Sequence, residues 1–175
     1  MHYKNTISNY GLISKIFHWL SAALLLIQIP LGFYLVDLDF GDEKLKIEKI
    51  HIIIGLTIFY LVILRLLNNL FNPTPKFDKS KFLGQKILAK INHLLLYLTI
   101  LSITVSGILK KLFNGETLNL FFREIALKEN FELADQFYDI HVFSNYSVVI
   151  LVTIHILAVI FHKVFFNENL IKKIL

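Results

Sequence analysis

Cysteine is absent from this chain of 175 residues, and Met1 is its only methionine. The absence of cysteine excludes disulfides, thiolate metal sites and any cofactor attached covalently through a Cys-x-x-Cys-His motif. Cysteine usage therefore does not indicate the redox compartment. Any metal or cofactor in this chain has to be bound through nitrogen or oxygen ligands.

Acidic residues are missing from four long apolar segments. Apolar residues make up 55% of the chain and its mean hydropathy is +0.62, whereas soluble domains are about 45–50% apolar. A helix needs about 20 apolar residues to cross a bilayer. We therefore expect an all-α integral membrane protein, a four-helix bundle that forms one domain over residues 1–175. The expected spans cover residues 16–36, 50–67, 91–109 and 140–161.

Basic residues gather on one side of the expected bundle. Four spans put both termini on the same side as the second loop, and this side carries 11 of the 18 basic residues but only 2 of the 13 acidic ones. The positive-inside rule therefore predicts that both termini are cytoplasmic. Basic residues that flank apolar segments suit a membrane surface with anionic lipid, and we expect no nucleic-acid partner. The 11 residues are Lys4, Lys15, Arg65, Lys76, Lys79, Lys81, Lys86, Lys90, Lys163, Lys172 and Lys173.

Several histidines lie within the spans, where an ionisable residue is costly and indicates function. His141 and His155 are 14 residues apart on the fourth span, so they share one face and are separated by roughly 21 Å along the helix axis. His51 begins the second span on the outer side, where it can face His141. His18 lies near the start of the first span on the inner side. This arrangement predicts two stacked cofactors, each gripped between histidines near one membrane surface.

The inner partner of His18 stays open on spacing alone. His155, His162 and His93 all lie on the inner side, and His155 and His162 share a face because they are seven residues apart. For His93 and His162 the alternative interpretation is a solvated side chain at the membrane edge.

The chemistry of the pairs favours haem over other metals. Zinc and copper would require ligands clustered at one level, and a proton relay would usually recruit acidic residues within the spans. Neither pattern is present. Without cysteine or an internal methionine, histidine is left as the axial ligand of a bound haem.

Short motifs occur in a specific order along the chain. They are Phe17-His18-Trp19, Lys49-Ile50-His51, Leu64-Arg65-Leu66-Leu67, Pro73-Thr74-Pro75, His93-Leu94-Leu95-Leu96-Tyr97, Ser106-Gly107, His141, Thr153-Ile154-His155 and Phe161-His162-Lys163. In this order they resemble the bacterial cytochrome b561 family from about Ser14 to the C-terminus.

The resemblance implies a b-type protein of the bacterial inner membrane that holds two non-covalent haem b groups. It implies that His18 and His155 ligate the inner haem, and that His51 and His141 ligate the outer haem. Arg65 is the candidate for contact with a haem propionate, and an ordinary basic anchor at the membrane edge is the alternative interpretation.

The function that the resemblance implies is transmembrane electron transfer. Two axial histidines leave iron no open position, which favours electron transfer over oxygen chemistry. If the protein is an enzyme, we expect an oxidoreductase linked to a quinone such as ubiquinone, with superoxide oxidation suggested by family analogy. One alternative is a haem-bearing anchor subunit of a respiratory dehydrogenase or hydrogenase, which would bind a redox partner protein. Another is a histidine-dependent transporter or channel.

The longest loop is the third, over residues 110–139. Its phenylalanines predict an amphipathic cap that lies on the membrane surface. They are Phe113, Phe121, Phe122, Phe131 and Phe137.

Overall fold

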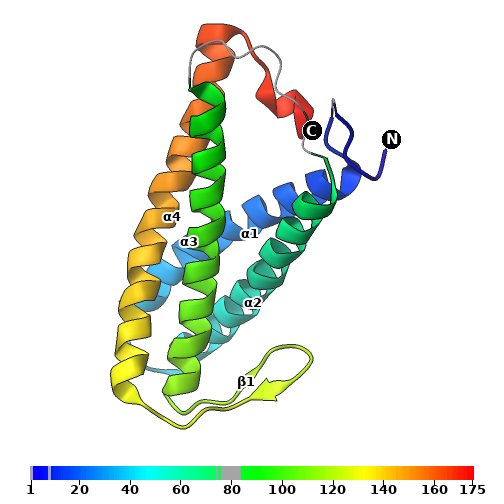
Figure 1. Cartoon of the computed structure of the whole chain (residues 1–175). Helices are drawn as coiled ribbons and strands as arrows, with labels where there is room; N and C mark the ends of the chain where they lie inside the picture. The colour runs from blue at the N-terminus through cyan, green and yellow to red at the C-terminus, as the bar shows by residue number, and fades with distance from the viewer. Residues whose placement is uncertain (1, 8, 74, 76–83) are drawn as a thin grey trace.

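Four long helices make up most of the protein (Figure 1). The computed structural model describes residues 2–7, 9–73, 75 and 84–175. The helices are α1 (Leu12–Asp37), α2 (Asp42–Phe71), α3 (Gln85–Phe113) and α4 (Phe131–Phe166). Strands β1 (Leu118–Asn119) and β2 (Glu124–Ile125) form a small antiparallel hairpin between α3 and α4, and the 3-10 turn η1 (Leu170–Lys173) follows α4.

Each of the four helices is long and apolar enough to cross a membrane. Their outward surface is rich in large apolar side chains such as Leu26, Phe143 and Ile150, which are 66%, 74% and 59% exposed. In a bilayer such side chains face lipid, and the helix satisfies its own backbone hydrogen bonds. The prediction of a four-helix membrane bundle is confirmed, and every expected span lies inside one of these helices.

The third loop is shorter than predicted. Residues 110–113 belong to α3 and residues 131–139 belong to α4, so the loop covers only residues 114–130. Asn130 begins α4 by accepting a hydrogen bond of 3.1 Å from the backbone N–H of Leu133. The predicted span began only after the acidic residues of the first α4 turns, because charged residues are excluded from the apolar layer of a membrane. The helix itself continues through these residues outside that layer.

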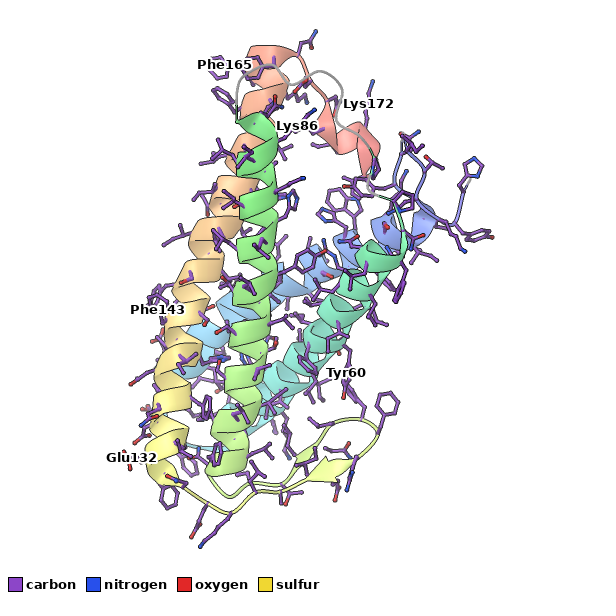
Figure 2. All side chains as sticks on the ribbon, viewed as in Figure 1. Tyr60, Lys86, Glu132, Phe143, Phe165 and Lys172 are labelled. Carbon is purple, nitrogen blue, oxygen red and sulfur yellow. The ribbon has the colours of Figure 1, made fainter. Side chains whose placement is uncertain are left out.

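The predicted aromatic cap is correspondingly divided. Phe113 and Phe137 stack on each other across α3 and α4, with ring centres 5.7 Å apart. Phe121 and Phe122 instead lie at the tip of the β-hairpin, where both rings contact Tyr60 of α2. Figure 2 shows Tyr60 on α2 beside this hairpin, and its hydroxyl donates a hydrogen bond of 2.9 Å to the Leu120 carbonyl.

The bundle consists of two antiparallel helix hairpins. Helix α1 packs mainly along α2, and α3 packs mainly along α4 (Figure 1). A core cluster of buried residues from α2, α3 and α4 joins the two hairpins in the middle of the bundle. Its members are Ile58, Val62, Ile100 and Val148.

Both ends of the chain lie at the same end of the bundle (Figure 1), which we call the inner end. The Trp19 indole donates a hydrogen bond of 2.9 Å to the Ile174 carbonyl, so the segment after α4 is tied to the start of α1. Lys86 and Lys172 lie at this end and Glu132 lies at the opposite, outer end (Figure 2). The cytoplasmic location of the inner end remains a prediction. Part of its expected charge and turn signal, at Thr74, Lys76, Asp78, Lys79 and Lys81, lies outside the described residues.

Candidate functional site

The fold brings the four predicted histidine ligands together in two pairs. The ring centres of His18 on α1 and His155 on α4 are 6.4 Å apart, and we call this pair the inner site. The ring centres of His51 on α2 and His141 on α4 are 6.2 Å apart, and this pair is the outer site. Each site therefore joins the α1–α2 hairpin to α4.

The separation of the rings suits an iron atom between them. A histidine nitrogen lies about 2 Å from a bound metal ion, so two imidazoles on opposite sides of one iron have ring centres roughly 6.3 Å apart. Both pairs meet this requirement. His93 on α3 also approaches His155, but at 5.2 Å between ring centres the two rings are too close to hold iron between them.

Glycines on α1 and α3 make room for the histidine rings of the outer site. A β-carbon on Gly107 of α3 would lie 3.0 Å from Cε1 and Nδ1 of His141. A β-carbon on Gly32 of α1 would lie 3.3 Å from Cε1 of His51. Both distances are shorter than ordinary van der Waals contact, so these glycines allow the histidines to lie directly against the neighbouring helices.

The tautomer of His141 follows from its hydrogen bond. Its Nδ1 lies 2.7 Å from the backbone carbonyl oxygen of Ile103 on α3. A carbonyl oxygen only accepts, so the proton is on Nδ1 and the lone pair of Nε2 is available to a metal. A carbonyl partner of this kind is the usual orienting group of a metal-bound histidine.

The inner site has a different set of neighbours. The Arg65 guanidinium donates from Nη2 to Nδ1 of His18 over 3.3 Å, and it lies over the ring of Tyr97 with its Cζ 5.5 Å from the ring centre. The side-chain amide nitrogen of Asn92 lies 3.4 Å from Nδ1 of His155. Arg65 therefore contacts the inner site directly, and its role toward a haem propionate remains a prediction.

The two histidines whose role the sequence left open have partners of their own. Nδ1 of His93 bonds to the Ala89 carbonyl of the preceding helical turn over 2.6 Å. His162 is buried, and its Nδ1 lies 2.9 Å from a carboxylate oxygen of Glu168 and 3.3 Å from the amide nitrogen of Gln85. The ring of His162 is thus engaged at the inner end by α3 and the segment after α4.

An ion-pair cluster centred on Lys111 lies at the outer end of the bundle. Nζ of Lys111 lies 2.9 Å from a carboxylate oxygen of Glu48 and also pairs with Glu116. The Lys111 side chain is only 12% exposed. This cluster ties Glu48 of α2, which lies about one turn before His51, to the end of α3.

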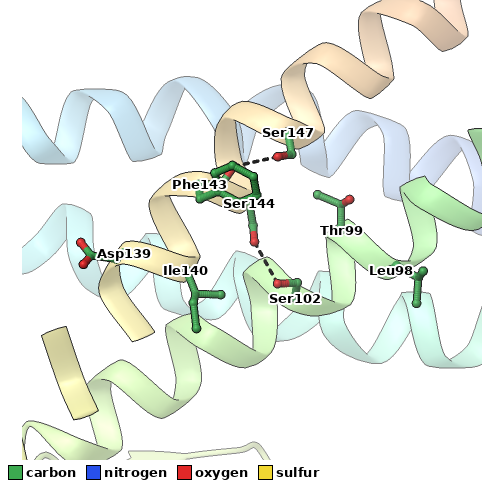
Figure 3. Close-up of a pocket in the computed structure, with 8 residues that line it drawn as sticks. All are labelled: Leu98, Thr99, Ser102, Asp139, Ile140, Phe143, Ser144 and Ser147. Carbon is green, nitrogen blue, oxygen red and sulfur yellow. Dashed lines mark hydrogen bonds between the residues drawn. The ribbon is translucent and has the colours of Figure 1, made fainter. Parts of the chain in front are cut away.

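A shallow groove runs between α3 and α4 on the surface of the bundle (Figure 3). At its floor the hydroxyls of Ser102 and Ser144 are 2.9 Å apart, and Ser144 is three residues beyond His141 on α4. Phe143 borders the groove and is 74% exposed. The lining residues are Leu98, Thr99, Ser102, Asp139, Ile140, Phe143, Ser144 and Ser147.

Comparison with known proteins agrees with this site. The sequence profile of the prokaryotic cytochrome b561 family matches residues 9–175. This chain belongs to that family. It is also 30% identical over 179 residues to cytochrome b561 homolog 2 of Escherichia coli (strain K12), a match that covers 100% of this chain and 95% of the relative. The resemblance inferred from the motifs is confirmed.

Membership of the cytochrome b561 family makes this chain a multi-pass membrane protein of a family that binds haem b and transfers electrons. Its outward apolar faces contact lipid. The separation of the histidine rings is compatible with haem b at both sites, and the glycines and the Nδ1 bond of His141 add to this fit at the outer site.

Sequence reasoning missed several residues around the histidines. Gln28, Asn92 and Gly32 had no assigned role, and Gly107 appeared only within a family motif. A signal was present for Gln28, which is the one side-chain amide in the first expected span. No pattern in the sequence indicated that the Ile103 carbonyl would face His141.

Proposed function

We propose that this cytochrome b561 family member carries electrons across the membrane through two haem b groups. In this proposal His18 and His155 ligate the inner haem, and His51 and His141 ligate the outer haem. The observation that carries it is the pair of ring separations, 6.4 Å and 6.2 Å, at two levels of one bundle. The 14 residues between His141 and His155 correspond to roughly 21 Å along α4, so the two levels lie near opposite membrane surfaces.

Haem supplies reversible one-electron chemistry, and the residues of the chain position it and adjust its potential. The four histidines would hold the two haems through their imidazole nitrogens, and haem held in this way would supply electron transfer and not oxygen chemistry. Gly32 and Gly107 keep the outer ligands close to the neighbouring helices. Arg65 is the residue that would neutralise a propionate at the inner site, because guanidinium groups pair with carboxylates through two parallel hydrogen bonds.

The layer between the two sites is mainly apolar. The core cluster occupies it together with partly buried residues such as Leu24, Leu25 and Leu101. The proposal places the inner end in the cytoplasm and the protein in the bacterial inner membrane, in line with the charge bias of the two ends.

A quinone is the proposed exchange partner within the membrane. The support is the groove between α3 and α4, which opens to the lipid and passes one helical turn from His141. Superoxide as a donor at the outer face rests on family analogy alone. Among the described residues, no group of three or more histidine and acidic side chains converges as a closed metal site would need, so no observation favours the histidine-dependent transporter.

The decisive experiment is the optical spectrum of the purified protein in detergent, oxidised and then reduced with dithionite, with haem quantified as the pyridine haemochrome. We expect a sharp reduced α-band and two haems b per chain. One haem per chain would remove one of the two sites. A haem-free protein from cells supplied with a haem precursor would overturn the proposal.

The same preparation separates a free-standing carrier from an anchor subunit. We expect the haems of the isolated protein to be reduced by a short-chain quinol in detergent without any other subunit. Co-purification of a soluble dehydrogenase or hydrogenase from mildly solubilised native membranes, together with failure of the isolated chain to react with quinol, would instead assign it as an anchor.

A further inference from the structure

Two buried polar atoms at the outer site have no hydrogen-bond partner among the described residues. They are Oε1 of Gln28 on α1 and Nδ1 of His51 on α2. Leaving a buried polar group unpaired costs roughly 1–3 kcal/mol, and a bilayer offers no water to compensate. Two such atoms on residues that contact each other across α1 and α2 require an explanation.

Gln28 already contacts His51 through its other amide atom. Its Nε2 donates a hydrogen bond of 2.9 Å to the backbone carbonyl oxygen of His51. Gly55, one turn further along α2, leaves space for this amide, because a β-carbon there would lie 3.3 Å from Nε2 of Gln28. Gly32 is four residues beyond Gln28 on α1 and lies against the His51 ring. Gln28 and Gly32, on one face of α1, therefore both lie against His51.

Ligation of iron determines which proton His51 must carry. When Nε2 binds a metal, Nδ1 keeps its proton and needs an acceptor, which for a metal-bound histidine is normally a carbonyl or carboxylate oxygen. His141, the opposite ligand, has this acceptor in the Ile103 carbonyl at 2.7 Å. For His51 the unpaired amide oxygen of Gln28 is of the same chemical class.

We propose that Gln28 is the positioning residue of the outer haem: once His51 binds iron and carries its proton on Nδ1, Oε1 of Gln28 turns to accept that proton, a bond that the structure itself does not contain, while its Nε2 holds the His51 backbone. The inference rests on the proposed function and deepens it. An acceptor on Nδ1 makes the imidazole a stronger electron donor, which stabilises ferric over ferrous iron. Gln28 therefore lowers the potential of the outer haem as well as fixing the orientation of its ligand.

Two substitutions separate the two contacts. Q28L removes both the acceptor and the donor, whereas Q28E keeps an acceptor oxygen for His51 Nδ1 and loses only the amide donor to the backbone. In redox titrations of the full-length protein, we expect Q28L to favour ferrous over ferric iron at the outer haem by roughly tenfold, which is about 59 mV upward for one electron. We expect Q28E to leave that potential at or below the wild-type value. The inner potential should not change in either variant.

The matched control is Y34F, which removes the hydrogen bond of 2.8 Å that the Tyr34 hydroxyl of α1 donates to a Glu43 carboxylate oxygen of α2. It also deletes an interhelical polar contact, and we expect neither potential to move. Loss of the outer haem in Q28L with retention in Q28E would also support the proposal. Equal potentials in wild type and Q28L, or equal loss of the outer haem in both variants, would overturn it and assign Gln28 to helix packing. Absence of haem in the wild type would instead overturn the proposed function.

Discussion

The outer and inner sites each pair two histidines, but they differ in how far the surrounding side chains already suit haem binding. At the outer site, His141 already has its proton on Nδ1 through the Ile103 carbonyl, and glycines lie against both rings. At the inner site, the Nδ1 atoms of both histidines face nitrogen donors. Arg65 can only donate to His18, which places the His18 proton on Nε2, the atom that would bind iron.

This difference shows that correct spacing of two histidines does not by itself make a finished haem site. Iron at the inner site requires Arg65 to leave His18, and it requires the Asn92 amide to present its oxygen to His155. Both adjustments involve flexible side chains and not the backbone. In exchange the inner site gains a guanidinium group in direct contact with one of its histidines.

The largest expected effect is the loss of one haem when one ligand is removed. H141A should lose the outer haem and H155A the inner haem, so that haem content falls from two to one per chain in each variant. Pyridine-haemochrome quantification measures this content, and potentiometry identifies the remaining haem. H2A is the control, since His2 lies on the exposed N-terminal segment. Two haems in either ligand variant would contradict the ligand assignment.

A steric change should affect only the outer site. G107V places a branched side chain where even a β-carbon would be 3.0 Å from the His141 ring. We expect most of the outer haem to be lost, with the inner haem retained and the folded state destabilised by about 1–3 kcal/mol. Haem content and thermal unfolding measure the two effects. G41A has no atom within 4 Å of its β-carbon and should change neither.

The two sites should also differ in haem affinity. Rearranging one or two side-chain hydrogen bonds costs about 1–1.5 kcal/mol, so the inner site should bind haem roughly tenfold more weakly. Titration of haem into apoprotein of H155A and of H141A measures the outer and the inner site separately. A tighter inner site would show that the Arg65 interaction with propionate outweighs the rearrangement.

Removing the positive charge should change only the inner potential. A cation beside haem favours the ferrous state, so R65Q should lower the inner midpoint potential by an amount on the order of 100 mV, as expected for a unit charge roughly 7 Å away at an effective dielectric constant near 20. R65K, which keeps the charge, should shift it less. An equal shift of both haems in R65Q would argue against a local role.

The smallest expected effect concerns the ion pairs of the outer end. K111M leaves Glu48 and Glu116 without their cation, and a partly buried pair of this kind contributes about 1 kcal/mol. We expect a small decrease in unfolding temperature relative to the wild type, and this difference should become smaller at high salt. Both haems should be retained. K128M, at an exposed loop position, is the control. Loss of the outer haem in K111M would show that the cluster helps to position His51.

Much of the architecture was predictable, because a membrane-spanning helix can be recognised in the sequence as a long apolar segment. The four apolar segments and the depth of each histidine followed from residue counting, and all four helices contain the predicted spans. The extent of the helices was not predictable by the same criterion. Helix α4 begins at Phe131, before the first apolar residue of its predicted span, because a helix in water tolerates Asp135 and Asp139.

The sequence by itself determined the height of each histidine in the bundle, since a helix advances by about 1.5 Å per residue whatever its surroundings. It left open which inner histidine would face His18. The tertiary structure placed His155 near His18 and turned His162 toward Gln85 and Glu168. It also supplied the Ile103 carbonyl and the Gln28 amide around the outer ligands. These neighbours come from other helices, and the rotation of one helix against another depends on the packing of the whole bundle.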